Sequence, residues 1–125
     1  MNRRVFLVSI ACLAMASWVA AKSPTKVIAH RGYWKTEGSA QNSLRSLEKA
    51  AEVKVYGSEF DVHLTADNVL IVNHDNDIQG KPIQTSTYAE LKDLKLPNGE
   101  NVPTLEQYLL KAKEKANRNV RLIFE

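Results

Sequence analysis

The chain has 125 residues, of which 44% are hydrophobic and 25% are charged. These values are ordinary for a soluble globular protein, and the length allows one compact domain. Arg3 and Arg4 are two of the 17 basic residues and lie in a segment that we expect to be removed, so the remainder carries 15 basic residues against 14 acidic ones. A balance this close to neutral excludes nucleic-acid binding that depends on charge alone.

The first 21 residues have the three parts of an export signal. Two arginines begin it, residues 5–16 form an apolar run, and residues 19–21 offer the small side chains that signal peptidase needs. We therefore expect a signal peptide over residues 1–21, a mature chain over residues 22–125 and a periplasmic or extracellular location. The apolar run is short for a bilayer span, so we expect no stable membrane anchor after cleavage.

Cys12 is the single cysteine, and it lies inside this apolar run. A lipoprotein would carry its lipid on such a cysteine, but Ser9 stands where a lipoprotein signal usually has leucine. Cleavage after the apolar run leaves a mature chain without cysteine. This excludes disulfide bonds, a thiol nucleophile and a thiolate metal site.

The first half of the mature chain alternates between strand and helix patterns. Residues 27–29 are a short apolar run and predict a buried strand. Residues 42–53 place apolar side chains at helical spacing, with Asn42 or Ser43 as the N-cap. Residues 59–64 alternate polar and apolar side chains, which predicts a strand with its odd-numbered positions on one face.

The second half continues the alternation. Asp67-Asn68 predicts a tight turn before a buried strand at 69–72. Thr87 caps a short helix, a second helix opens at Pro103-Thr104, and residues 120–124 form a last strand. This order predicts an α/β protein with a largely parallel sheet. A parallel sheet is normally covered on both faces, so the uncovered last strand suggests a truncated chain.

Polar side chains that could carry chemistry gather at the ends of the predicted strands. They are His30 and Arg31 after the first strand, Glu59 and Asp61 on the second, His74 after the third and Glu125 after the last. The carboxyl ends of parallel strands build the active sites of α/β folds, so we expect these groups to meet. Carboxylates without thiolates favour a hard cation such as Mg²⁺ or Ca²⁺ over Zn²⁺.

Each of these residues also has a structural interpretation. Glu59 and Asp61 could form a solvated strand face, although two like charges in a covered strand favour a counter-ion. Arg31 could pair with an acid instead of binding phosphate. His74 could be structural or catalytic, and we interpret His63 as a bystander near the turn.

Five stretches of the chain, taken in order, resemble the motifs of glycerophosphodiester phosphodiesterases. They are VIAHRG at 27–32, EFDVHLTAD at 59–67, VNHD at 72–75, VPTLE at 102–106 and LIFE at 122–125. The resemblance therefore covers essentially the whole mature chain.

The resemblance implies a (β/α)₈ barrel of the TIM type with its site at the C-terminal face. Such barrels need about 250 residues, so the chain would supply the first half, about four strands. The implied roles are ligation of one divalent cation, Ca²⁺ or Mg²⁺, by Glu59, Asp61 and the strand-four Glu125, acid–base catalysis by His30 and His74, and phosphate binding by Arg31.

The implied reaction is hydrolysis of a glycerophosphodiester, a small molecule, to glycerol 3-phosphate and an alcohol. One alternative is a phospholipase C- or D-like enzyme acting on intact lipid, but the mature chain shows no exposed amphipathic basic helix. Another is a metal- or ligand-binding fragment without turnover. We expect the 125-residue chain to be inactive alone, because its last ligand would stand on a frayed end.

The chain departs from the family pattern at two places. The family has Pro-Glu-Asn-Thr before the first helix, whereas this chain has Ala40-Gln41-Asn42-Ser43 and so lacks one carboxylate. This loss could alter metal affinity or substrate choice. The family's Asp-Gly turn is Asp67-Asn68 here, a mild change because asparagine also tolerates the left-handed region.

Overall fold

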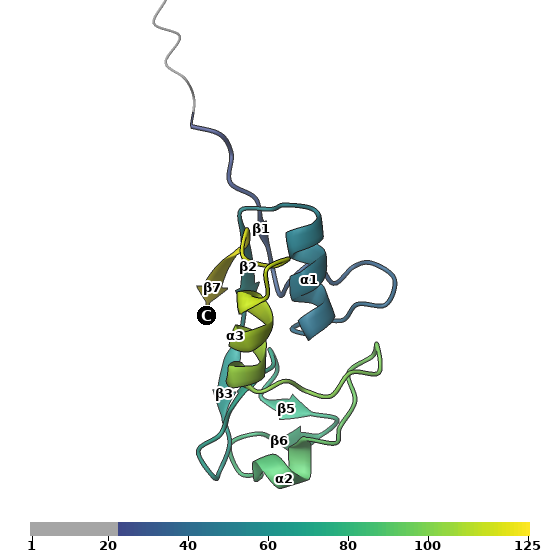
Figure 1. Cartoon of the computed structure of the whole chain (residues 1–125). Coiled ribbons are helices and arrows are strands. Elements are labelled where there is room, and N and C mark those ends of the chain that lie inside the picture. Colours follow the sequence, from purple (N-terminus) through teal and green to yellow (C-terminus); the bar gives the residue numbers. More distant parts are fainter. Residues whose placement is uncertain (1–22) are drawn as a thin grey trace, which may run out of the picture.

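A computed structural model describes residues 23–125 of the chain (Figure 1). The expected signal peptide at 1–21 and its cleavage site lie outside these residues. The described helices are α1 (Leu44–Glu52), α2 (Tyr88–Leu91) and α3 (Leu105–Lys113). The strands are β1 (Ile28–Ala29), β2 (Gly57–Phe60), β3 (Val62–Leu64), β4 (Leu70–Val72), β5 (Asp77–Ile78), β6 (Lys81–Pro82) and β7 (Arg121–Phe124).

The predicted parallel sheet is present and consists of three strands in the order β1-β2-β7. Both pairs are parallel, with Ala29 opposite Ser58 and Phe60 opposite Phe124. Parallel neighbours need a long crossover connection, which contains α1 before β2 and α3 before β7. All three strands therefore bring their carboxyl ends to the same edge of the sheet.

The strand predicted at 69–72 does not join this sheet. It forms β4, which pairs antiparallel with β3 through the turn at Asp67 and Asn68. The prediction of one continuous strand over 59–64 was also wrong, because the chain leaves the parallel sheet after β2 and begins the hairpin one residue later. A turn this short cannot connect parallel strands. β7 is consequently the third parallel strand, directly beside β2, instead of the expected fourth.

Helices α1 and α3 begin at capped residues and cover the sheet. Ser43, one of the two expected N-caps, accepts a hydrogen bond from the Ser46 backbone N–H at 3.0 Å. The Thr104 hydroxyl likewise accepts a hydrogen bond from the Gln107 backbone N–H at 3.1 Å. In return, the Gln107 side-chain oxygen accepts one from the Thr104 backbone N–H. The apolar residues of α1, whose helical spacing was predicted, turn one face toward β2.

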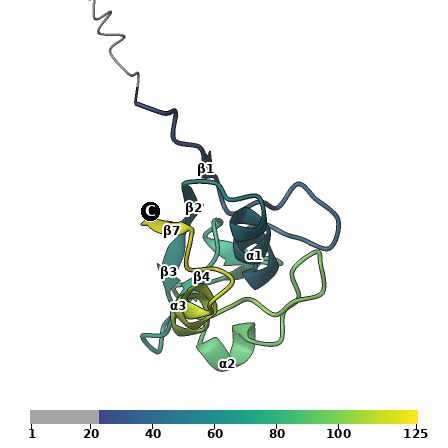
Figure 2. The ribbon, with the colours of Figure 1, turned by 45° about the horizontal axis from the view of Figure 1, so that its top comes forward.

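Two hydrophobic cores lie on opposite sides of β4. The larger contains residues of α1, β2, β4 and α3 together with the residue before β7, namely Leu47, Ala50, Ala51, Phe60, Val72, Tyr108 and Val120. The smaller lies under α2 and contains Ile71, Ile78, Ile83, Leu91 and Val102. Adjacent residues of β4 therefore belong to different cores, and both Figures 1 and 2 show α2 at the end of the molecule remote from β1.

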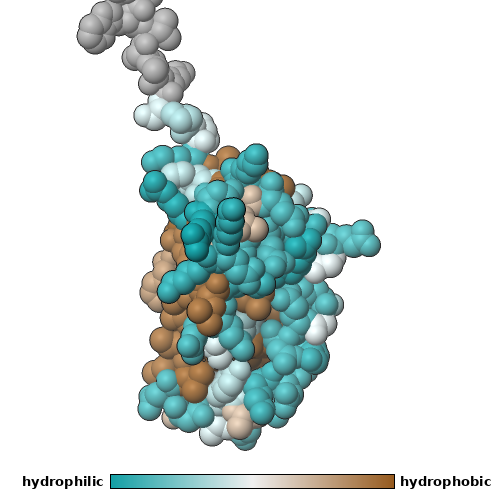
Figure 3. Space-filling view, in the orientation of Figure 1, coloured by the Kyte–Doolittle hydropathy of each residue, from teal (hydrophilic) through white to brown (hydrophobic). Residues whose placement is uncertain are grey.

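The parallel sheet is open at β1 and β7. Ile28 is 46% exposed and Phe124 is 68% exposed. On α3, Leu109 and Leu110 are exposed. Figure 3 shows apolar side chains gathered on the side where α3, β3 and β7 lie. Among the described residues, no helix has the length and apolar character needed to cross a bilayer.

Candidate active site

Three carboxylates converge at the carboxyl edge of the parallel sheet. Glu59, Asp61 and Glu125 each offer an oxygen atom, and these oxygens lie within 4.8 Å of one another. The strand pairing explains the convergence: Phe60 lies opposite Phe124, and the Glu125 backbone N–H donates to the Phe60 carbonyl at 3.1 Å. Glu59 and Asp61 therefore share one face, as predicted, and Glu125 joins them from the neighbouring strand.

The donor set of this cluster fits a hard divalent cation. Glu59 is only 6% exposed, and its Oε1 is buried without a hydrogen-bond partner in the described part of the chain. A buried, unpartnered carboxylate oxygen next to two further carboxylates is costly without a cation. A Ca²⁺ ion binds oxygens at about 2.3–2.6 Å, so oxygens up to roughly 5 Å apart can share one ion.

The loop after β1 supplies a histidine and an arginine to the same cluster. Arg31 has a left-handed backbone (φ 59°), and its N–H donates to Glu59 Oε2 at 2.7 Å. The Nη1 of Arg31 donates to Gln41 Oε1 at 2.7 Å. The His30 Nε2 lies 3.8 Å from Glu59 Oε2, and the His30 side chain is 66% exposed. Glu59 thus connects both residues to the acidic cluster, and His30 remains open to a ligand.

Glycine is required after Arg31 because the backbone passes directly over α1. Gly32 has φ 78°, and a Cβ there would come within 2.2 Å of Ser46 Oγ. This close contact holds the loop after β1 against the start of α1. The loop therefore presents His30 and Arg31 from a fixed support.

Asn42 holds Asp61, a contact that the sequence did not reveal. Its Nδ2 donates to Asp61 Oδ2 at 2.8 Å, and its Oδ1 accepts from the Asp61 backbone N–H at 3.3 Å. Asn42 is 1% exposed and has a left-handed backbone (φ 56°). The sequence offered it as a possible N-cap of α1. The structure gives that place to Ser43 and leaves Asn42 free to orient a candidate metal ligand.

His74 reaches the site through the hairpin instead of through the parallel sheet. The backbone N–H of Asn73 donates to the Asp61 carbonyl at 3.1 Å, so the end of β4 returns to the start of β3. His63, expected to be a bystander, places its Nε2 3.0 Å from the His74 carbonyl oxygen. The Nδ1 of His74 lies 2.8 Å from Asp75 Oδ1. Asp75 is a second contact that the sequence analysis missed, although it follows His74 directly.

Tyr108 lies beneath the cluster in the larger core. Burial raises the pKa of Tyr108 to about 12, while the nearby Ser58 hydroxyl opposes the rise and the Glu59 charge adds to it. Within residues 23–125 neither hydroxyl has a hydrogen-bond partner of good geometry. Tyr108 therefore stays neutral at physiological pH and supports the site by packing.

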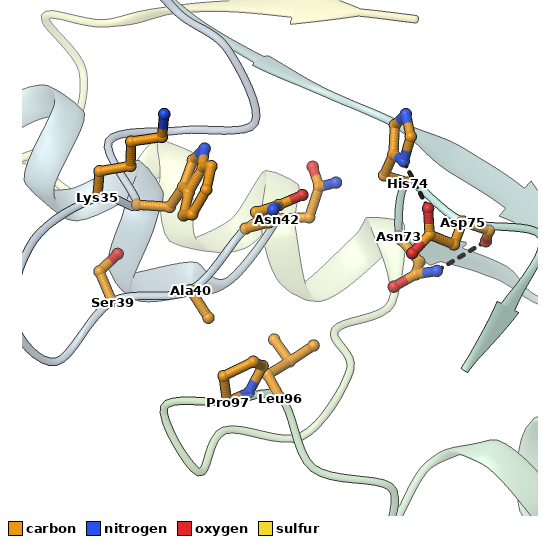
Figure 4. Close-up of a pocket in the computed structure, with 11 residues that line it drawn as sticks. Lys35, Ser39, Ala40, Asn42, Asn73, His74, Asp75, Leu96 and Pro97 are labelled. Atoms are coloured by element: carbon orange, nitrogen blue, oxygen red, sulfur yellow. Dashed lines mark hydrogen bonds and ion pairs between the residues drawn. The ribbon is translucent and has the colours of Figure 1, made fainter. Parts of the chain in front are cut away.

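A pocket of about 390 Å³ adjoins the cluster (Figure 4). Lys35, Ser39, Ala40 and Asn42 come from the segment before α1, and Asn73, His74 and Asp75 face them from the end of the hairpin. Trp34, Gln41, Leu96 and Pro97 complete the wall. Gln41 and Asn42 line the pocket and also hydrogen-bond to Arg31 and Asp61, so the pocket lies next to the acidic cluster.

Comparison with known proteins identifies the family. Residues 30–123 match the Glycerophosphoryl diester phosphodiesterase family. The chain belongs to this family. Among solved structures, a glycerophosphodiester phosphodiesterase from Parabacteroides distasonis is 76% identical, with a TM-score of 0.77 over 79% of this chain and 41% of that one.

Two further relatives of known structure are more distant. The Thermotoga maritima enzyme is 26% identical over 82% of this chain and 44% of its own, with a TM-score of 0.64. A phosphodiesterase from Oleispira antarctica, in complex with the product sn-glycerol-3-phosphate, is 27% identical over 81% of this chain and 44% of its own, with a TM-score of 0.61. No curated protein sequence matches the chain. The chain thus spans less than half the length of these solved relatives.

The family and the fold class predicted from the sequence are confirmed. The glycerophosphodiester phosphodiesterase relatives are TIM-barrel enzymes, and the described residues form an α/β part of that fold with an unclosed sheet. The geometry brings Glu59, Asp61 and Glu125 together, with Arg31 and His30 beside them. Their roles in catalysis and metal binding stay predictions.

Proposed function

We propose that the protein containing this chain hydrolyses glycerophosphodiesters to glycerol 3-phosphate and an alcohol. The observation that carries the proposal is the convergence of Glu59, Asp61 and Glu125 at one edge of the sheet, with an arginine and a histidine in contact with Glu59. The family membership of the chain supports the same reaction. The Oleispira relative binds sn-glycerol-3-phosphate as its product, which supports this product here.

The three carboxylates would hold one divalent cation, and we propose Ca²⁺ or Mg²⁺ because all three ligands are hard oxygen donors. When bound, such an ion would neutralise negative charge on a phosphoryl oxygen. Asn42 fixes the Asp61 carboxylate through two hydrogen bonds. Because Asn42 is uncharged, it fixes the orientation of the Asp61 carboxylate and leaves the negative charge of that carboxylate available to the cation.

Arg31 would bind the phosphate of the substrate. Its backbone N–H is tied to Glu59, and its guanidinium is held by the neutral Gln41. Arginine offers several donors in a planar fork that fits phosphate oxygens. Within residues 23–125 no carboxylate forms an ion pair with this guanidinium, whose Nη1 is held by Gln41, so an anionic ligand could pair with it.

His30 and His74 would divide the two proton transfers of the reaction. One removes the proton from the attacking water or substrate hydroxyl, and the other protonates the leaving alkoxide. For His74, donation from Nδ1 to Asp75 keeps Nε2 unprotonated in the neutral ring, so that Nε2 can accept a proton. If both histidines exchange protons, kcat/KM passes through a maximum with pH, whereas a flat profile between about pH 5 and about pH 9 would exclude the pair.

We also propose that residues 1–21 direct export and are removed, which would place the enzyme in the periplasm or outside the cell. The sequence pattern described above supports this proposal. N-terminal sequencing of the exported protein should begin at Lys22. A product that keeps Arg3 and Arg4 would refute it.

Hydrolysis of glycerophosphoglycerol and glycerophosphocholine tests the proposed reaction. Each substrate is incubated with the 125-residue chain, and with the longer product if the reading frame continues, in Ca²⁺, Mg²⁺ or EDTA. We expect the longer product to release glycerol 3-phosphate in a reaction that EDTA abolishes and that His30→Ala slows by at least about 100-fold, whereas the 125-residue chain alone should be inactive. Lys115→Ala, an exposed turn residue, serves as the control.

Two outcomes would indicate a different function. Hydrolysis of intact phospholipid in preference to both diesters would indicate a phospholipase-like enzyme. Calcium binding by a folded protein that hydrolyses neither class of substrate would indicate a binding role without turnover.

A further inference from the structure

Gln41 is the residue that holds the side chain of Arg31. The Nη1 of Arg31 donates to Gln41 Oε1 at 2.7 Å, and the Asn42 backbone N–H donates to the Arg31 carbonyl at 3.0 Å. A guanidinium has only donors, so the carboxamide of Gln41 must turn its oxygen toward Arg31. One side-chain contact and one backbone contact therefore fix the position of Gln41 relative to Arg31.

The guanidinium of Arg31 has no carboxylate partner to offset its positive charge. Within residues 23–125 Arg31 takes part in no ion pair, and its Nε is buried without a hydrogen-bond partner. An arginine that is held through an uncharged oxygen offers its full charge to a ligand. A carboxylate in the place of the Gln41 carboxamide would cancel much of this charge, because opposite charges in contact oppose each other's field.

We propose that Gln41 is a specificity-determining residue, whose neutrality makes the phosphate site favour the doubly charged product over the singly charged substrate. The inference rests on the proposed function, in which Arg31 binds the phosphate. A phosphodiester carries one negative charge, whereas a phosphate monoester carries close to two above about pH 7, since its second pKa is about 6. The Coulomb attraction to Arg31 grows in proportion to this charge. Glycerol 3-phosphate is therefore held more tightly than the diester and inhibits the enzyme.

Calorimetric titration with a matched pair of ligands tests the inference. The monoester is glycerol 3-phosphate and the diester is its methyl ester, both added at about pH 8 in the presence of Ca²⁺. The protein that contains this chain carries His30→Ala, so that the diester is not consumed. Gln41→Glu should weaken binding of the diester by about threefold and of the monoester by about tenfold, because the added charge repels two charges twice as strongly as one.

Two further variants separate the charge of residue 41 from its structural role. Gln41→Met removes the hydrogen bond to Arg31 without adding charge, so the ratio of the two affinities should stay within about twofold. Gln107→Glu makes the same chemical change on an exposed residue of α3, where glutamate also completes the capping box, and should leave both affinities unchanged. The candidate metal cluster is the same in every variant, so the comparison isolates residue 41.

The outcomes separate this inference from the proposed function. Gln41→Glu that weakens both ligands by the same factor, or neither, would overturn the inference even if the protein hydrolyses glycerophosphodiesters. Gln41→Met that narrows the preference as much as Gln41→Glu would also overturn it. The expected change supports the inference even if hydrolysis fails. If glycerol 3-phosphate does not bind the protein with His30 intact, the phosphate role of Arg31 and the inference both fall.

Discussion

Replacement of Asn42 by glycine tests whether this residue positions the candidate metal ligand Asp61. The side chain of Asn42 makes one hydrogen bond of 2.8 Å to the Asp61 carboxylate and one of 3.3 Å from the Asp61 backbone N–H. A hydrogen bond to a charged group contributes about 1.5–3 kcal/mol and a neutral one about 0.5–1.5 kcal/mol. We therefore expect Asn42→Gly to lower the free energy of unfolding by about 2–4.5 kcal/mol.

Glycine is the better replacement because Asn42 has φ 56°, which glycine adopts without strain. Asn42→Ala loses the same hydrogen bonds and keeps the left-handed Cβ, whose steric cost of about 1–2 kcal/mol the glycine variant avoids. The alanine variant should therefore be less stable than the glycine variant. Urea denaturation followed by circular dichroism measures both differences.

The Ca²⁺ affinity of this variant distinguishes a role of Asn42 in positioning Asp61 from a role in stability alone. Loss of a residue that orients a metal ligand typically weakens metal affinity by about 10- to 100-fold. Calorimetric titration of the folded Asn42→Gly variant with Ca²⁺ should show a loss of this size. Asn68→Gly is the matched control, because Asn68 is also left-handed (φ 63°) but lies in the hairpin turn. Unchanged Ca²⁺ affinity in Asn42→Gly would refute the positioning role.

Three further changes test how the fold supports the site. Gly32→Ala should lower the free energy of unfolding by more than about 2 kcal/mol in urea, since its Cβ would come 2.2 Å from Ser46 Oγ at a left-handed φ. Thr104→Ala should cost about 1 kcal/mol in the same measurement, because it removes the cap on the Gln107 N–H. The pKa of Tyr108, raised by burial to about 12, means that the folded state holds this proton more tightly than the unfolded state. The free energy of unfolding should therefore fall from about pH 10 to about pH 12 by roughly 2–3 kcal/mol, and Tyr108→Phe should remove that fall.

The sequence predicted the elements of the fold better than their pairing. The helical spacing of the apolar residues and the caps at Ser43 and Thr104 depend on local chemistry, and the structure has both helices where they were expected. The pairing of 69–72 was predicted wrongly, although the turn at 67–68 was recognised. A connection of this length allows only antiparallel pairing. The error was to treat each apolar run as a strand of one parallel sheet.

Glu125 shows what the residues alone could not provide. Its role was implied by the family resemblance, because nothing in the local sequence connects a terminal glutamate to Glu59 and Asp61. The connection comes from the pairing of β2 with β7, which are more than sixty residues apart along the chain. Asn42 was missed for a related reason: asparagine before a helix is a common N-cap, and its contact with Asp61 depends on the tertiary structure.

The hairpin that was missed also explains how the two predicted parts of the site are joined. β3 begins one residue after Asp61, and the end of β4 returns to the Asp61 carbonyl through the Asn73 N–H. His63 lies within hydrogen-bond distance of the His74 carbonyl oxygen from the same hairpin. The position of His74 is thus set by backbone contacts to a candidate metal ligand, because His74 does not belong to the parallel sheet. A change that opens the hairpin should therefore displace His74 while leaving Glu59 and Glu125 paired through β2 and β7.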